Sequence, residues 1–222
     1  MGVLIRHSTC VRPCRKFYTE VAHKEGAGQV FPDDRDPPTY DVVCWFWTVG
    51  DDIRERGDRD RVPYALWRDQ GFLEAPAGRA IDKGAVVQVL AEVMGKYDVR
   101  GIAYDRWRIA ELQKLISDEG LDVPLIEWGQ GFKDMSPAVD ALESVILDGR
   151  LRHGGQPVLR WCAANASVTA DPAGNRKLDK AKSIGRIDGV VALAMAVGLA
   201  DRAEVPIRSP YLNDRPGGFL FV

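Results

Sequence analysis

The sequence predicts a mixed α/β fold in which parallel strands alternate with helices. Short apolar runs at residues 100–104 and 123–126 are each followed by a helical period, over 107–119 and 134–149. This strand–helix alternation is typical of a layered α/β domain with parallel strands. The chain has 222 residues, of which 45% are hydrophobic and 28% charged, so it is long enough for one such domain with its own core.

Upstream of this alternation, the first forty residues are rich in Pro and Gly and sustain no helix or strand period. Residues 40–49 are β-branched and aromatic and predict a strand. The charged stretch 50–61 predicts a loop or a solvated helical turn. Pro63 opens a helix to about Asp69, because proline is tolerated in a first turn. Asp82 is placed to cap the next amphipathic helix, whose apolar residues run to Met94.

Downstream, the same reasoning predicts a helix near 157–167, a hairpin and a last helix over 185–200. The hairpin turn at 171–175 has the sequence DPAGN, which is strong turn chemistry. Residues 201–222 contain three prolines and a Gly-Gly pair and predict a loosely docked tail.

Charge and cysteine content limit the function classes. The net charge is −2, so any nucleic-acid site must be a local patch. No apolar run is long enough for a membrane span or a signal peptide, which predicts a cytoplasmic protein without membrane partners. Cys10 and Cys14, with His7 and His23, could form a zinc site, but incidental thiols in a reducing cytoplasm are the preferred interpretation.

Two aspartates are the candidate catalytic residues. Asp105 directly follows the apolar strand, where functional groups of open α/β sheets collect, although it could instead cap the next helix. Asp188 lies in the first turn of an apolar helix, where the helix dipole favours it. Alternatively, Asp188 has a functional role rather than a structural one, because a carboxylate on a buried helix is costly unless it is paired or bound to a metal.

Together the two acids predict a metal site. Carboxylates that converge from separate elements hold Mg²⁺ or Mn²⁺ in two-metal nucleases, and both ions prefer oxygen ligands. One aspartate at a strand end and one on a C-terminal helix is the arrangement of the ribonuclease H-like fold, a mixed sheet flanked by helices. That fold needs a third acid on its first, central strand.

A basic stretch over residues 150–186 lies between the two acids. It is suited to phosphate contacts, although a solvated loop is the plainer interpretation. The predicted DNA-binding residues are Arg152, Arg176, Lys177, Lys180, Lys182 and Arg186. The tryptophans, among them Trp128 and Trp161, are expected in the core, and His153 is expected to be structural.

Several short segments in a fixed order carry a family resemblance. They are Val62-Pro63-Tyr64, Ala75-Pro76-Ala77-Gly78, Ile102 to Trp107, Gln130-Gly131 with Ser136-Pro137, Leu151-Arg152-His153-Gly154, Trp161 with Asn165, and Lys180 followed by Ile187-Asp188-Gly189. In this order they resemble the C-terminal nuclease domain of the large terminase subunit of tailed phages, over residues 31–200.

This resemblance implies a ribonuclease H-like domain that cuts double-stranded phage DNA through water activated by Mg²⁺ or Mn²⁺. Asp105 and Asp188 match the family's second and third catalytic acids, and Lys180 and Arg186 fall in its basic loop. The terminase small subunit and the portal are the implied partners. No G-x-x-x-x-G-K-[ST] segment is present, so the chain is expected to lack the ATPase motor.

The N-terminal segment departs from the family. The family's first acid lies on an early strand, yet residues 2–28 contain Glu20 and Glu25 and no Asp. Residues 1–30 are therefore expected to be irregular and to lack the first catalytic strand, through a shifted reading frame or a late start codon. Two alternatives to an active nuclease follow: an inactive prophage remnant or DNA-binding fragment, and a different ribonuclease H-like enzyme such as a resolvase or transposase.

Overall fold

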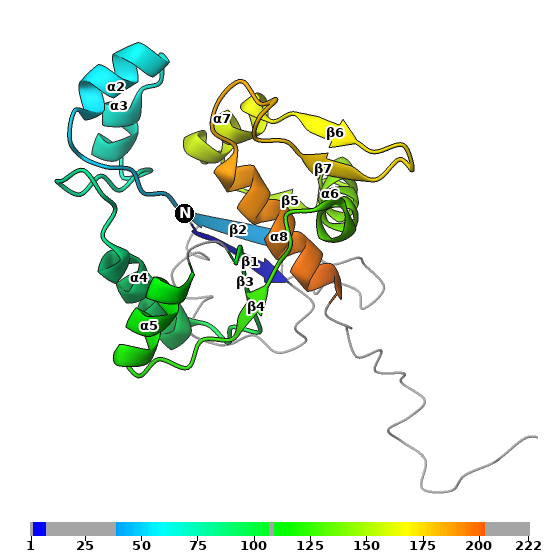
Figure 1. The fold of residues 1–222 in the computed structure, drawn as a ribbon, viewed down its shortest axis with the longest axis horizontal. Helices are drawn as coiled ribbons and strands as arrows, with labels where there is room; N and C mark the ends of the chain where they lie inside the picture. Colours follow the sequence, from blue (N-terminus) through cyan, green and yellow to red (C-terminus); the bar gives the residue numbers. More distant parts are fainter. Residues whose placement is uncertain (1, 8–38, 107–108, 203–222) are drawn as a thin grey trace, which may run out of the picture.

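The computed structural model describes residues 2–7, 39–106 and 109–202 (Figure 1). In chain order the elements are β1 (Gly2–His7), β2 (Tyr40–Trp45), α2 (Ile53–Asp60), α3 (Tyr64–Asp69), α4 (Lys83–Lys96), β3 (Ile102–Tyr104), α5 (Ala110–Asp118), β4 (Leu125–Glu127), α6 (Phe132–Leu147), β5 (Leu151–Arg152), α7 (Pro157–Asn165), β6 (Val168–Ala170), β7 (Arg176–Leu178) and α8 (Asp188–Arg202).

The strands pair in three groups. β1 is antiparallel to β2, with Gly2 opposite Trp45, and β2 continues parallel to β5, with Tyr40 opposite Leu151. β3 and β4 form a parallel pair, and β6 and β7 form an antiparallel hairpin. The mixture of parallel and antiparallel pairs, with helices around it, confirms the predicted mixed α/β fold.

Helix α8 lies at the centre of the packing. It crosses β1 in Figure 1 and packs against α6, α7, β1 and β3. Its middle is made of Ala, Val, Gly, Leu and Met residues, and Ala194 and Val197 are fully buried. A helix that is apolar around most of its circumference is stable only when neighbours cover it, so α8 forms the centre of the core.

Small residues let α8 approach its neighbours closely. A Cβ at Gly198 would lie 2.7 Å from the Cβ of Ala138 in α6, and one at Gly189 would lie 2.8 Å from the Phe46 ring. Such distances leave no space for an added methyl group. Glycine is therefore required at both positions for packing rather than for backbone conformation.

The β3–β4 pair runs toward the N-terminal half of α8. Gly101, just before β3, lies beside Leu199 near the C-terminal end of α8. After β4, successive residues contact α8 at positions nearer its N-terminus. Trp128 lies beside Gly198, and the Gln130 amide donates a hydrogen bond of 3.3 Å to the Met195 sulfur. The carboxyl ends of both strands therefore point toward the start of α8.

An aromatic cluster joins α3 to α7. Tyr64 and Trp67 of α3 each contact the Trp161 ring of α7, with centroid distances of 6.1 and 5.7 Å. Trp128 is 1% exposed. The expectation that tryptophans serve the core is confirmed for Trp47 and Trp128, which are buried, and Trp161 is half-buried with its ring packed on α3.

The structure corrects the sequence predictions in two places. A strand, β1, occupies Gly2–His7, where no strand period was expected, because its six residues are recruited by backbone pairing with β2. The charged stretch after residue 50 contains the full helix α2. The predicted tail lies outside the described residues from residue 203 onward, as does most of the N-terminal segment, including Cys10 and Cys14.

The close contact of α6 and α8 gives a stability prediction. Gly198→Val should lower the free energy of unfolding by about 1–3 kcal/mol, because the added atoms overlap Ala138. Gly95→Ala is the matched control: a Cβ there meets no atom within 4 Å, so the better helix former should raise stability by up to about 1 kcal/mol. Urea unfolding measures both, and equal stability of Gly198→Val and the unmodified chain would contradict the packing argument.

Candidate active site

Asp105 lies just beyond the carboxyl end of β3 and is half-buried. The following helix, α5, begins only at Ala110, with Ile109 at its N-cap position. The interpretation of Asp105 as an N-cap is therefore wrong. Next to it, Arg106 forms an ion pair of 3.7 Å with Glu127 at the end of β4, so charged groups gather where the two parallel strands end.

Asp188 is the first residue of α8, and its side chain is 37% exposed. The Lys180 ammonium donates a hydrogen bond of 2.7 Å to its Oδ1 atom. The helix N-terminus also favours the carboxylate. Asp188 thus has a charged partner, in agreement with the expectation that a carboxylate on an apolar helix is paired.

The buried Cys162 thiol of α7 lies next to this helix start. Burial raises its pKa, the Gly189 amide opposes this through a hydrogen bond to the sulfur, and the negative charge of Asp188 adds to the increase. The thiol therefore stays protonated at neutral pH, which makes it a poor metal ligand.

Lys180 is positioned by a tightly hydrogen-bonded loop, residues 179–186. The Asp179 carboxylate accepts from the amides of Ala181 and Lys182 at 3.0 and 3.3 Å. The Ser183 hydroxyl donates to the Asp179 carbonyl at 2.7 Å and accepts from the Ser167 amide at 3.1 Å. These bonds fix the loop on the end of α7, so the cations that it carries project from a defined framework.

Both aspartates can be located along their own elements relative to the contact between Gly101 and Leu199. Asp188 lies about 16 Å along the helix axis from Leu199 at ~1.5 Å per residue. Asp105 follows Gly101 by four residues, about 13 Å of extended chain at ~3.3 Å per residue. Gly101 itself lies beside Leu199.

The described residues alone do not complete a set of metal ligands. In the part of the chain that the structure describes, no group of three or more His, Cys, Asp or Glu side chains is arranged to hold a metal ion. The sequence of β1, GVLIRH, supplies no carboxylate. Asp105 and Asp188 offer the oxygen atoms that Mg²⁺ and Mn²⁺ prefer, but these two groups alone do not fit a bridged metal pair.

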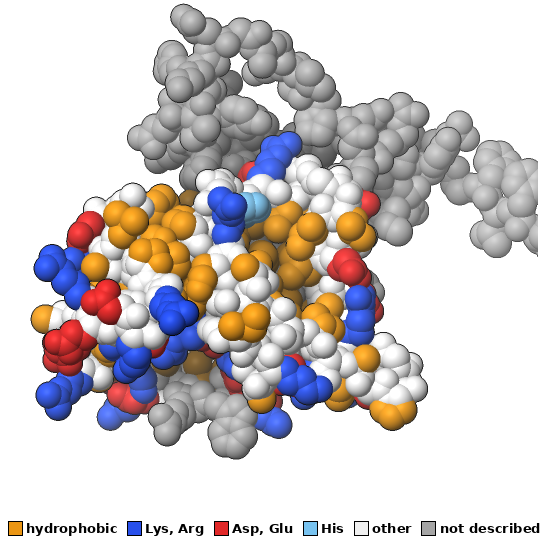
Figure 2. Space-filling model, turned by 90° about the horizontal axis from the view of Figure 1, so that it is seen from above, with side chains coloured by type: hydrophobic (Ala, Val, Ile, Leu, Met, Phe, Trp, Pro, Cys, Tyr) orange, Lys and Arg blue, Asp and Glu red, His pale blue; other side chains and the backbone are white. Residues whose placement is uncertain are grey.

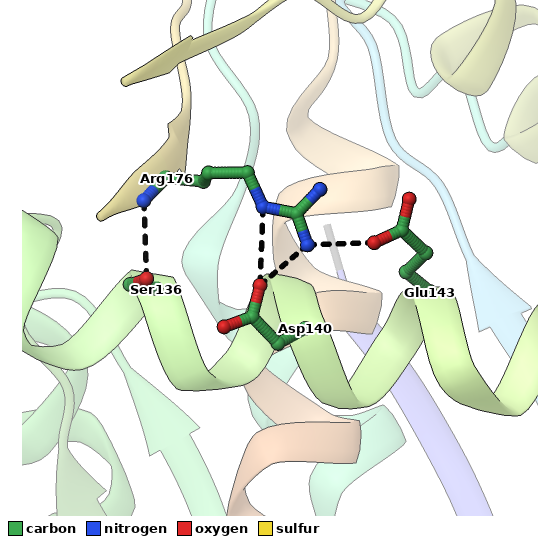
Figure 3. A network of polar contacts seen from close by, with 4 residues as sticks. All are labelled: Ser136, Asp140, Glu143 and Arg176. Carbon is green, nitrogen blue, oxygen red and sulfur yellow. Dashed lines mark hydrogen bonds and ion pairs between the residues drawn. The ribbon is translucent and has the colours of Figure 1, made fainter. Parts of the chain in front are cut away.

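Arg176 makes internal contacts rather than projecting freely (Figure 3). Its guanidinium binds Asp140 at 2.5 Å and Glu143 at 2.6 Å, and its amide donates to the Ser136 hydroxyl at 3.0 Å. All three partners lie on α6. These contacts fix the β6–β7 hairpin to α6, so Arg176 can reach a phosphate only when its bonds to the two carboxylates break.

The other predicted DNA-binding cations are distributed around the hairpin and the loop. The Lys177 ammonium lies 4.9 Å from the Phe132 ring centroid, and Lys182 donates to the Thr169 hydroxyl at 3.0 Å. Arg152 is exposed in β5, and Arg186 is exposed just before α8. On the face drawn in Figure 2, basic side chains are interspersed with acidic and hydrophobic ones rather than forming one continuous patch.

The partners of Arg176 were missed in the sequence. Ser136, Asp140 and Glu143 are spaced at i, i+4 and i+7, which places them on one face of a helix. That spacing predicts a polar face on α6. It did not identify Arg176 as the residue bound there, because the contact spans more than thirty residues of sequence.

The chain was then compared with known proteins. A family model described as "Terminase large subunit, endonuclease domain" matches residues 47–204. The chain belongs to this terminase family. It is 47% identical to the terminase large subunit of Enterobacteria phage HK97 over 190 residues, and 28% identical to protein YmfN of Escherichia coli K12 over 167 residues. These matches cover 84% and 72% of the chain.

The solved structures agree with this family membership. The crystal structure of the HK97 large terminase matches with a TM-score of 0.70 and 51% identity, over 74% of this chain and 34% of that one. The fold is therefore the ribonuclease H-like fold of terminase nuclease domains. The chain spans 38% and 36% of the lengths of the HK97 protein and YmfN. Among the described helices, none is both long and apolar enough to cross a bilayer.

The tie between Arg176 and α6 gives a pH prediction. The hydrogen bond and charge of Arg176 hold the pKa of Glu143 below its usual value. Because the folded-state pKa is lowered, ionised Glu143 stabilises the fold above its unfolded pKa of ~4.3, and this stabilisation is lost as the pH falls through the folded value. Glu143→Gln should lower the unfolding midpoint at pH 7 and weaken its acid dependence.

The control is Glu119→Gln, which changes an exposed carboxylate at the end of α5. Thermal unfolding followed by circular dichroism between pH 7 and about pH 3 compares the three proteins. Identical curves for Glu143→Gln and Glu119→Gln would show that the Arg176 contact contributes nothing to stability.

Proposed function

We propose that the chain is the DNA-cleaving nuclease domain of a phage terminase large subunit. The membership in the terminase endonuclease family carries this proposal, and the positions of Asp105 after β3 and Asp188 at the start of α8 support it. The substrate is double-stranded phage DNA during packaging. The same proposal includes the terminase small subunit and the portal as partners, and the cytoplasm of the host cell as the location.

Asp105 and Asp188 are the proposed catalytic residues and metal ligands, for Mg²⁺ or Mn²⁺. A bound ion of this kind supplies Lewis-acid chemistry at a phosphate and lowers the pKa of a coordinated water. The chain's own contribution is to hold carboxylates at the end of a rigid strand and at the start of a buried helix. Lys180 donates a hydrogen bond to the Asp188 carboxylate and orients it.

Lys180, Lys182 and Arg186 are the proposed main phosphate contacts, together with Arg152 and Lys177. The first three follow one another along a hydrogen-bonded loop that leads directly into Asp188. A backbone phosphate bound to this loop is therefore held next to the proposed metal ligands. Arg176 contributes indirectly, by fixing the hairpin from which the loop emerges.

Cleavage of supercoiled plasmid DNA in Mn²⁺ tests the proposal. The unmodified chain should nick or linearise the plasmid, and Asp105→Asn and Asp188→Asn should each reduce the rate by more than about 100-fold, since each removes a charged oxygen ligand. Both substitutions keep the size of the side chain. Asp118→Asn, at an exposed position of α5, is the matched control and should cleave normally.

Two results would contradict parts of this proposal. Full activity of both active-site variants would show that the site assignment is wrong. Duplex binding by the unmodified chain without cleavage in either Mn²⁺ or Mg²⁺ would instead support a DNA-binding fragment with an incomplete metal site.

A further inference from the structure

One exposed apolar side chain of the 179–186 loop has no role in the fold. Ile184 is 91% exposed, whereas Ile187, three residues later, is 1% exposed and belongs to the core. Ile184 has the highest exposure of the exposed large hydrophobic residues among those described. A single exposed apolar residue needs no explanation by itself. The setting of Ile184, however, is unusual in two respects.

First, the backbone holds Ile184 in place. Its own amide donates to the Asn165 carbonyl at 3.3 Å, and the preceding Ser183 is bonded through amide and hydroxyl to the Asp179 carbonyl. After it, Gly185 approaches Asn165 so closely that a Cβ there would lie 2.7 Å from the side-chain nitrogen. The apolar tip is therefore presented by a preformed framework, and little conformational entropy is lost when it binds.

Second, the tip is surrounded by cations in sequence. Lys180, Ala181, Lys182, Ile184 and Arg186 are all exposed, whereas Ser183 and Gly185 are half-buried. The loop thus carries three exposed cations and one exposed aliphatic side chain. Lys180 donates to Asp188, so the cations begin at the candidate active site. Lys182 donates to Thr169, and the charge of Arg186 acts on Asp60.

We propose that Ile184 is a DNA wedge, which inserts between base pairs of duplex DNA while the flanking cations bind the backbone phosphates. Proteins that kink DNA combine basic side chains with an inserted Ile, Leu, Phe, Met or Pro in this way. A protein–protein contact fits less well, because charged residues are depleted from the centres of such interfaces. The proposal rests on the proposed function and deepens it by naming how the duplex is held.

The wedge has a defined purpose at this position. Partial unstacking beside the loop that leads into Asp188 would bend the duplex there. Pyrimidine–purine steps unstack most easily, so they should be the preferred sites of insertion.

Fluorescence of 2-aminopurine tests the wedge without requiring cleavage. A short duplex carries 2-aminopurine at a pyrimidine–purine step, and binding is followed in EDTA at low salt. The unmodified chain should increase the fluorescence. Ile184→Ser should abolish the increase and weaken duplex binding about tenfold, whereas Ile184→Leu should retain both.

Two matched variants complete the test. Leu147→Ser changes a residue that is 79% exposed at the end of α6 and should bind like the unmodified chain. Lys182→Ala should weaken binding and lower the salt dependence by about one phosphate contact, while the fluorescence increase of the bound duplex persists. Circular dichroism confirms that each variant is folded.

The outcomes separate the wedge from the function it rests on. If Ile184→Ser binds with unchanged affinity and fluorescence, the wedge is wrong and the nuclease proposal stands. If Ile184→Ser instead changes only self-association in sedimentation experiments, the tip is a protein contact and the wedge is again wrong. If the unmodified chain binds no duplex at all, both proposals fail.

Discussion

The burial of α8 is the constraint on which the rest of the structure depends. The helix is apolar around most of its surface and is covered by α6, α7, β1 and β3. Each neighbour contributes a different part of the domain, and none of them covers it alone. The glycines of α8 pack directly against Phe46 and α6, with no space for a larger residue. The helix therefore has one position in the core, and that position fixes where its first residue, Asp188, lies.

Charged side chains act mainly by tying secondary elements together. Arg176 joins the hairpin to α6, Arg202 joins the end of α8 to Asp134, and Lys180 joins the loop to the start of α8. Exposed ion pairs of this kind contribute little to global stability. Their effect here is positional, since Arg176 and Lys180 each set where a surface segment rests on the domain and Arg202 ties the end of α8 to α6.

The parts of the fold with strong local signals could be predicted from the sequence. The helical periods of α6 and α8 and the DPAGN turn were found close to their true positions, because helix and turn chemistry is local. β1 was missed, since its six residues form a strand only through pairing with the distant β2. The positions of Asp105 at a strand end and Asp188 at a helix start were also predicted, and their catalytic role stays a prediction. The interactions of Arg176 were not, because they join surfaces that only the tertiary fold brings together.

The glycine contact between α6 and α8 also shapes the segment that carries the loop. Residues 176–188 start at Arg176, which is bonded to α6, and end at Asp188 on α8. Since α6 and α8 meet almost backbone to backbone at Gly198 and Ala138, both ends of this segment are anchored to one rigid body. The segment is thus held at both ends. Its loop-closure entropy is lost during folding, so a ligand that binds the exposed cations of the segment meets a surface that is already ordered.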